Sequence, residues 1–255
     1  YAIVQQITGI NAVLFYAPTV FEQLGFGTNS AFMQAIWVGL AGLVFTIISL
    51  FLIDRVGRRP LTLYGLLWAM LSLSICAIGF HQASYTLEAE DIVALENVDK
   101  KQLDHLVGIE YTSDVQFKAA LRESLGEQLA KTNESVLFNK AAEIPSTMIL
   151  FGIISFVAAF HFSIGPIMWV IFSEIFPTSV RGVAIPAFAF VTSIVSYLVQ
   201  QFFPWQLTHM GARDIFFFYA VAGAIGLAFL FKYLPETKNR TIEEIAENMA
   251  ASAKS

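Results

Sequence analysis

The chain has 255 residues, of which 56% are hydrophobic and only 14% are charged, whereas about 25% of the residues in an ordinary soluble domain are charged. Its mean hydropathy of +0.63 excludes a disordered chain and a typical soluble enzyme. The net charge of −5 does not support nucleic-acid binding, for which a basic surface is expected. A single cysteine excludes an intrachain disulfide framework. The composition therefore predicts an integral membrane protein.

Six apolar segments follow one another along the chain, and each has about the 20 residues that an α-helix needs to cross a bilayer. The period-2 alternation of a membrane barrel is absent. No basic region or cleavage site of a signal peptide accompanies the first segment, so we expect it to be a truncated helix of a longer protein. The segments lie near residues 1–21, 31–53, 61–80, 147–172, 180–203 and 215–234.

A polar insert interrupts these segments, and it divides the chain into four parts. Basic residues gather in the short loops on one side of the segments, eight against one on the other, which predicts that this side and the C-terminus are cytoplasmic and that the insert lies outside. The parts are helices one to three (1–80, the first truncated), the extracytoplasmic insert (81–143), helices four to six (144–234) and a cytoplasmic tail (235–255).

The insert has the pattern of a folded helical region. Ser113 and Gln116 have the spacing of a capping box, and the apolar residues after them recur every four positions, which indicates one helical stripe. Local packing is favoured for this stripe over a partner surface. Asn133 begins a glycosylation sequon, which has meaning only in a eukaryotic secretory pathway. The stripe consists of Phe117, Leu121, Leu125 and Leu129.

Polar side chains in the first segment indicate a ligand route, because such groups are costly inside a membrane. The amides of Gln5, Gln6 and Asn11 offer both donors and acceptors, which suits a neutral polyhydroxylated ligand; Tyr16 follows them. Gln5 and Asn11 do not share a helical face, but a bend or break at Gly9 and Pro18 would let them converge. Interhelical hydrogen bonding by the same amides remains the alternative.

The fourth segment carries a second set of residues that could contact a ligand. Gly165 and Pro166 interrupt the backbone bonding in mid-segment, and Trp169 can stack on the apolar face of a sugar while its N–H donates. A structural role is favoured for His161 over a proton relay. The fifth segment adds a weaker polar set that mixes packing and cavity lining: Thr192, Ser193, Ser196, Gln200 and Gln201.

Charged residues mark the cytoplasmic ends of the segments. Asp54 and Arg58 stand at i,i+4 and can pair. One interpretation is positive-inside anchoring with surface ion pairs of little energetic weight. The other is an interhelical cluster that closes one face of a rocking transporter. The cluster comprises Asp54, Arg58, Arg59, Glu174 and Arg181.

Several chemistries are excluded by missing motifs. The chain has no G-x-x-x-x-G-K loop for ATP, no zinc-ligand spacing and no Gly-x-Ser-x-Gly nucleophile. We therefore expect no enzymatic activity, no cofactor and no metal.

Four stretches resemble the motifs of the sugar porter family of the major facilitator superfamily. They are Gln5-Gln6-Ile-Thr-Gly9-Ile-Asn11; Asp54-Arg55-Val-Gly57-Arg58-Arg59; Gly165-Pro166-Ile-Met-Trp169 with Ser173-Glu174-Ile-Phe-Pro177 and Arg181-Gly182; and Pro235-Glu236-Thr237-Lys238. The resemblance implies an all-α fold in which the six segments are helices 7–12 of a twelve-helix transporter. The insert lies outside it.

The resemblance also implies roles for residues. Gln5, Gln6, Asn11 and Trp169 match sugar-contacting positions, Gly165 lines the same pocket, and the charged cluster matches a network that stabilises the outward-facing state. Four residues depart from the pattern at positions that bear on the gate or the sugar: Phe15, Gly42, Thr192 and Ser193.

We therefore expect a multi-pass protein of the cell membrane that transports a hexose or pentose by alternating access, as a proton symporter or a facilitator. Its partners would be the sugar, the lipid bilayer and the missing N-terminal six-helix half. The alternative is a transporter-like sensor that binds sugar without moving it.

Overall fold

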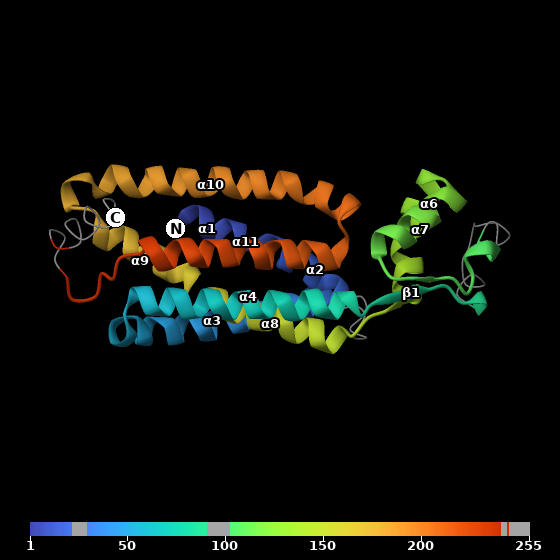
Figure 1. Ribbon diagram of the computed structural model, residues 1–255, viewed down its shortest axis with the longest axis horizontal. Coiled ribbons are helices and arrows are strands. Elements are labelled where there is room, and N and C mark those ends of the chain that lie inside the picture. The colour runs from blue at the N-terminus through green and yellow to red at the C-terminus, as the bar shows by residue number, and fades with distance from the viewer. Residues whose placement is uncertain (22–29, 91–102, 241–243, 245–255) are drawn as a thin grey trace.

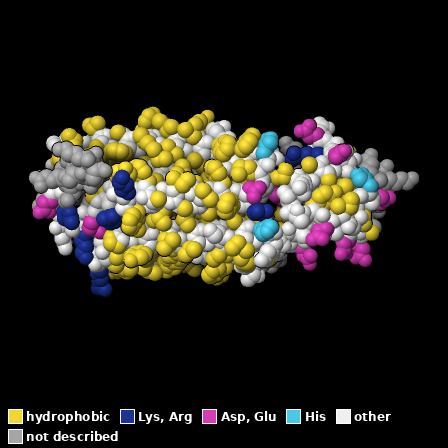
Figure 2. All heavy atoms as spheres, in the orientation of Figure 1, with side chains coloured by type: hydrophobic (Ala, Val, Ile, Leu, Met, Phe, Trp, Pro, Cys, Tyr) yellow, Lys and Arg dark blue, Asp and Glu magenta, His cyan; other side chains and the backbone are white. Residues whose placement is uncertain are grey.

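The computed structural model describes residues 1–21, 30–90, 103–240 and 244. Within them, five helical spans are long and apolar enough to cross a membrane. Apolar side chains coat this helical body in Figure 2. The spans are Ala35–Val56, Arg58–His81, Ser146–Ile175, Thr178–His209 and Gly211–Tyr233.

The first apolar segment is broken into two short helices, α1 (Ala2–Ile7) and α2 (Ile10–Phe21). The break falls at Gly9, whose φ of +80° is a conformation that L side chains rarely adopt. A Cβ at this position would lie 2.4 Å from the ring of Tyr219. The interruption expected near Gly9 is therefore present, and it has both a backbone and a packing cause.

The remaining long helices run side by side as a bundle, with α10 along one edge (Figure 1). Helix α4 packs mainly against α8 and α11, α3 packs against α8, and α10 packs against α1. The bounds are α3 (Ser30–Val56), α4 (Arg58–His81), α8 (Ser146–Phe162), α9 (Ile164–Ile175), α10 (Thr178–His209) and α11 (Gly211–Tyr233).

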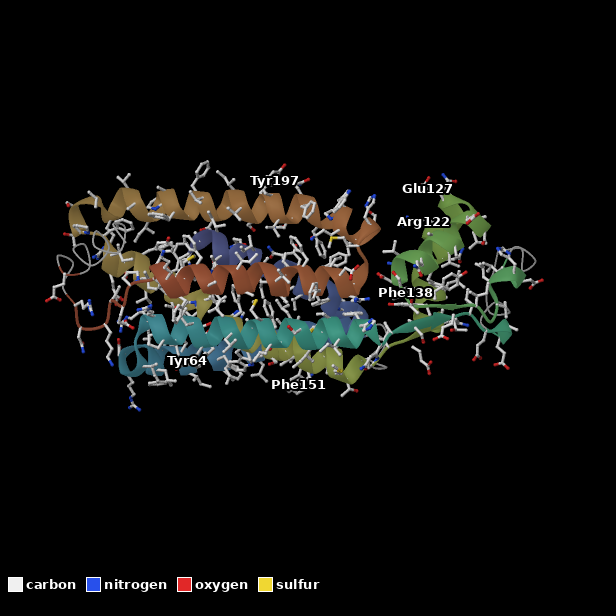
Figure 3. The ribbon with its side chains drawn as sticks, viewed as in Figure 1. Tyr64, Arg122, Glu127, Phe138, Phe151 and Tyr197 are labelled. Atoms are coloured by element: carbon white, nitrogen blue, oxygen red, sulfur yellow. The ribbon has the colours of Figure 1, made fainter. Side chains whose placement is uncertain are left out.

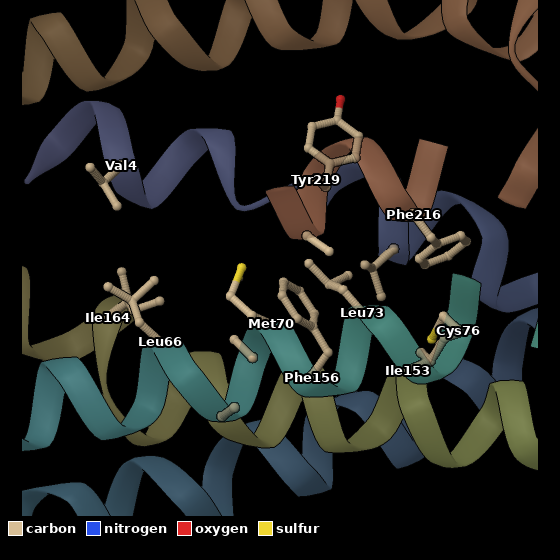
Figure 4. Packing of buried hydrophobic residues seen from close by; sticks show 14 of the residues in the cluster. Val4, Leu66, Met70, Leu73, Cys76, Ile153, Phe156, Ile164, Phe216 and Tyr219 are labelled. Atoms are coloured by element: carbon tan, nitrogen blue, oxygen red, sulfur yellow. The ribbon is translucent and has the colours of Figure 1, made fainter. Parts of the chain in front are cut away.

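The bundle core lies between α4, α8 and α11. Leu66, Met70 and Leu73 of α4 belong to one buried cluster with Phe156 of α8 and Phe216 of α11 (Figure 4). Small residues let these helices approach closely: a Cβ at Gly223 would lie 2.0 Å from Met70 Sδ. The core therefore fixes α4 as the helix against which the others are positioned.

The fourth apolar segment is also broken, between α8 and α9. Ser163 stands at the break with φ −135° and ψ −84°, and its hydroxyl donates to the Ala159 carbonyl at 2.8 Å. Pro166 then lies in the first turn of α9, where a backbone N–H has no intrahelical acceptor in any case. The Gly-Pro interruption expected from the sequence thus takes the form of a new helix start.

The region between α4 and α8 contains a small sheet as well as helices (Figure 1). Its strand order is β2-β1-β3, with Tyr85 of β1 opposite Tyr111 of β2 and Ala142 of β3. The elements are β1 (Ser84–Thr86), the 3-10 helix η4 (Asp104–Leu106), β2 (Glu110–Tyr111), α6 (Asp114–Leu125), α7 (Glu127–Ala141) and β3 (Ala142–Glu143).

Two expectations for this region are wrong in detail. Ser113 caps α6 without a side-chain hydrogen bond, so the capping box is not formed. The apolar stripe ends at Leu125: Phe117, Leu121 and Leu125 are buried, but Leu129 is 44% exposed. The cause is Gly126, whose φ of +75° ends α6 and starts α7 in a new direction.

One carboxylate joins the insert to the bundle. Asp114 of α6 accepts a hydrogen bond from the backbone N–H of Ala212, at the start of α11, at 3.2 Å. Gly211 has φ +76°, and a Cβ there would lie 2.7 Å from Asp114 Oδ1. Burial raises the pKa of Asp114 above its ordinary value, although Lys118 and backbone N–H groups act against this. The contact fixes the start of α11 against α6.

Candidate functional site

A polar hollow of about 380 Å³ lies between α1 and α10. Gln6 contributes to it from α1, and every other residue of the lining lies on α10. The α10 set, expected from the sequence to be the weaker one, is thus the larger part of the wall, and it also includes Tyr197, which the sequence did not indicate. The α10 lining is Thr192, Ser193, Ser196, Tyr197, Gln200 and Gln201.

The side chains of this wall bond within their own helix. Thr192 and Ser193 donate to the carbonyls of Phe188 and Ala189 at 2.9 Å each, and Gln200 Nε2 donates to Ser196 Oγ at 3.0 Å. Hydroxyl and amide groups keep further acceptor or donor capacity after one such bond. The hollow can therefore exchange hydrogen bonds with a hydroxylated ligand.

The three amides of the first segment have different surroundings. Gln5 is buried, and its Oε1 accepts from Gln6 Nε2 at 3.4 Å. Gln6 is half-buried and lines the hollow. Asn11 stands in the first turn of α2, beyond the break at Gly9, and is not part of the hollow's lining as described. Of the three, the structure brings only Gln6 to the α10 wall, and contacts of Gln5 and Asn11 with a sugar stay predictions.

The other predicted binding residues lie away from the described lining of this hollow. A Cβ at Gly165 would meet the ring of Phe160 at 3.2 Å. Trp169 on α9 is 45% exposed and makes an edge contact with Phe172. Tyr16 belongs to α2, and its side chain lies outside the described part of the molecule. Their roles remain predictions.

His161 and Gly42 are neighbours across α8 and α3. The Nδ1 atom of His161 lies 2.9 Å from the Val157 carbonyl one turn earlier. A Cβ at Gly42 would lie 3.2 Å from His161 Nε2. The absence of a side chain at Gly42, noted above as a departure from the family pattern, therefore leaves room for the imidazole ring.

The charged cluster is centred on Arg58, whose side chain is 12% exposed. Its Nε and Nη2 donate to both carboxylate oxygens of Glu174 on α9, at 2.6–3.1 Å. Nη2 also pairs with Asp54 Oδ1 at 3.0 Å, and Nη1 donates to the Ile53 carbonyl at 3.1 Å. The predicted pairing of Asp54, Arg58 and Glu174 is thus present, as a two-pronged bond between helix ends.

Two members of this cluster were missed because they follow α11, far from Arg58 in sequence. The Glu236 carboxylate accepts from the backbone N–H groups of Arg58 and Arg59 at 3.0 and 3.1 Å, so it caps the start of α4. Thr237 Oγ1 donates to Glu174 Oε2 at 2.6 Å. The motif Pro235-Glu236-Thr237-Lys238 was the only sequence signal for them.

Arg59 and Arg181, the other two predicted members, make different contacts. Arg59 Nη2 donates to the Phe231 carbonyl at 2.7 Å. Arg181 donates from Nε and Nη2 to the Phe176 carbonyl at 3.3 and 3.1 Å, which closes the turn between α9 and α10. In the described residues neither side chain bonds to Glu174, so the cluster is narrower than expected.

The sequence profile of the family described as "Sugar (and other) transporter" matches residues 1–95 and 130–249. These ranges contain all the membrane-length spans and the charged cluster. Residues 96–129, which include β2 and α6, fall outside the match.

Curated relatives agree with this profile. The chain is 31% identical over 250 residues to the D-xylose-proton symporter of Escherichia coli K12, covering 96% of the chain and 39% of the symporter. It is 30% identical to facilitated glucose transporter member 10 of Xenopus tropicalis (94% and 48%) and 31% identical to sugar transport protein 10 of Arabidopsis thaliana (94% and 37%). The chain thus spans less than half the length of these relatives.

A solved structure has the same arrangement of helices. The proton:xylose symporter bound to 6-bromo-6-deoxy-D-glucose superposes with a TM-score of 0.66 at 27% identity. The match covers 97% of the chain and 41% of the symporter.

Proposed function

The chain belongs to the sugar porter family of the major facilitator superfamily, and from this premise we propose that it is the C-terminal six-helix half of a transporter that carries a sugar across the membrane by alternating access. It is a multi-pass membrane protein of a transporter family, not of an enzyme family. The missing partner would be an N-terminal six-helix half, since the chain spans 37–48% of the relatives named above.

The observation that carries this proposal is the hollow between Gln6 and the polar row of α10. A neutral sugar needs several donors and acceptors in place of water, and a buried site that fails to pair them loses affinity. The break at Gly9 supports the proposal, because transporters commonly place binding sites at interrupted helices.

The charged cluster would act as the cytoplasmic gate. Arg58 and Glu174 stand at the ends of different helices, so their bidentate bond forms only while those ends are close together. Glu236 and Thr237 add the segment after α11 to the same contact. Breaking these contacts would separate the helix ends and favour the inward-facing state.

The substrate class is a pentose or a hexose. The relatives' names include proton symporters for xylose and arabinose and facilitated glucose transporters, so both modes of coupling occur among them. No contact in the described residues favours the sensor over the transporter.

Uptake of a panel of radiolabelled sugars by the full-length transporter, reconstituted in proteoliposomes, tests the proposal. Gln6→Ala removes a partner of the sugar and should lower affinity about ten- to a hundredfold. Ser193→Ala should lower it less. Ser74→Ala is the matched control, because Ser74 donates to its own helix as Ser193 does, at 2.9 Å, but lies on α4 away from the hollow.

Saturable uptake that is weakened by Gln6→Ala and unchanged by Ser74→Ala is the expected result. Unchanged affinity in a well-folded Gln6→Ala protein would reject the hollow as the sugar site. Binding without any uptake of the same sugar would support the sensor instead.

A further inference from the structure

A second, apolar groove of about 750 Å³ lies on the outside of the bundle between α4 and α11. Leu63, Tyr64 and Leu67 form one side, and Leu227 and Phe231 form the other. Tyr64 and Phe231 are 68% and 65% exposed, and Figure 3 shows Tyr64 toward the charged end of the bundle. The groove thus opens to the surroundings of the helices, which for a membrane protein are lipid.

Two small side chains of α11 leave space in the groove between the larger Leu227 and Phe231. Ala224 and Ala228 stand one turn apart on α11 and both line it. From Arg59 to Leu67 the α4 side extends over eight residue-to-residue steps, about 12 Å at 1.5 Å per step. That length is close to half of the ~30 Å hydrocarbon thickness, so the groove matches one leaflet.

A cation stands at one end of this apolar surface. Arg59 lines the groove, and its guanidinium lies over the ring of Phe231 at 5.8 Å. One of its five N–H donors is used on the Phe231 carbonyl, and the buried Nε has no partner in the described residues. The Arg59 side chain is therefore a positive charge held beside Phe231 by these two contacts, at the end predicted to face the cytoplasm.

We propose that this groove is a binding site for an anionic phospholipid of the cytoplasmic leaflet, with the acyl chain along α4 and α11 and the phosphate at Arg59. An arginine at the membrane surface attracts anionic headgroups, and guanidinium groups suit phosphate oxygens geometrically. A zwitterionic lipid would gain the apolar contact without the net charge. The site is separate from the polar hollow, which lies between α1 and α10.

Native mass spectrometry of the full-length transporter tests this site, because it reports both bound lipid and oligomeric state. The probes are dioleoyl phosphatidylglycerol, dioleoyl phosphatidylcholine and glycerol phosphate. We expect phosphatidylglycerol to bind about fivefold more tightly than phosphatidylcholine, as one cation near the surface provides. Glycerol phosphate, which lacks the acyl chains, should not compete.

Two variants act on the two parts of the site independently. Arg59→Gln should reduce phosphatidylglycerol binding to the level of phosphatidylcholine, while Arg55→Gln, an exposed arginine at the same end, should not. Leu67→Trp fills the groove and should weaken both lipids. Leu71→Trp is its control, one turn further along α4, exposed and outside the groove lining.

Each alternative has its own result. Equal losses in Arg59→Gln and Arg55→Gln would reduce the effect to general surface charge. Competition by glycerol phosphate would indicate a free-phosphate site. A dimer in phosphatidylcholine that Leu67→Trp abolishes would make the groove a contact between copies, and unchanged lipid binding in both Arg59→Gln and Leu67→Trp would overturn the proposal.

Discussion

Gly57 leaves the space that the Glu236 carboxylate occupies at the charged end of the bundle. This carboxylate accepts from the backbone N–H of Arg58, which lies 178 positions earlier in the sequence. A Cβ at Gly57 would lie 2.6 Å from Glu236 Oε2, and the φ of Gly57 is +106°. Gly57 precedes the first turn of α4. The backbone N–H groups of this turn have no acceptor within the helix, and those of Arg58 and Arg59 donate to the Glu236 carboxylate. The glycine is therefore required twice, for its backbone conformation and for the space it leaves.

Gly57→Ala should destabilise the protein by about 1–3 kcal/mol, the cost of a strained backbone conformation, with a further loss from displacing Glu236. Thermal unfolding of the full-length protein in detergent measures this. Gly182→Ala is the matched control, because Gly182 lies within α10 with open space around its Cβ position. Equal melting temperatures for the two variants would contradict the packing described here.

The Arg58→Lys variant distinguishes a gating role of the charged cluster from simple membrane anchoring, because lysine keeps the positive charge. A lysine cannot make the two-pronged bond to Glu174 and the bond to the Ile53 carbonyl together. We expect the closed state to lose about 1 kcal/mol of stability, since the Arg58–Glu174 pair is partly exposed and screened. That is about a fivefold shift toward the inward-facing state.

The measurement is transport rate alongside equilibrium sugar binding. Rate should fall in Arg58→Lys while binding is retained, and Arg55→Lys, at an exposed position nearby, should match the parent protein. Normal transport by Arg58→Lys would reduce the cluster to topological anchoring.

Asp114 should make stability depend on pH. Burial raises its pKa, so between the ordinary value of about 4 and the raised one the folded state binds more protons than the unfolded state. Stability therefore falls as pH rises through this window. Asp114→Asn keeps an acceptor for the Ala212 N–H and removes the titration.

Melting temperatures of the full-length protein from pH 4 to 8 check this sign. The parent protein should lose stability relative to Asp114→Asn as pH increases. Parallel curves for the two proteins would show that burial of this carboxylate has no net cost.

The sequence could predict features that depend on residues close together in the chain. In the described residues, the five membrane-length helices follow from apolar length, the break at Gly9 from backbone chemistry, and the Asp54–Arg58 pair from helical spacing. The second break falls at Ser163, just before the Gly165-Pro166 pair at which it was expected. The sheet of the insert was missed because strands of two or three residues are too short to show alternation.

Features that join distant segments could not be predicted in the same way. Glu236 reaches α4 only because α11 returns to its start, and the α10 row becomes a wall only because α1 packs against that helix. Arg181 carries the expected charge, yet the turn after α9 directs it to the Phe176 carbonyl. Spacing along the chain contains no information on these choices.

This chain should not suffice for transport on its own. Helix α10 packs on α1 yet leaves large apolar side chains exposed, among them Val183 at 77%, Phe190 at 67% and Tyr197 at 61%, and Tyr197 belongs to the wall of the polar hollow. If the substrate cavity of a two-half transporter lies between its halves, this chain supplies one wall of it. Residues 1–255 alone should therefore show weak or no sugar binding and no saturable uptake in liposomes, and co-expression with an N-terminal six-helix half should restore both. The matched control is the same co-expression with Gln6→Ala, which should insert normally but bind sugar about ten- to a hundredfold more weakly. Saturable uptake by purified 1–255 without a partner would mean that two copies of the chain assemble into the transporter, and the assignment as one half of a larger protein would be wrong.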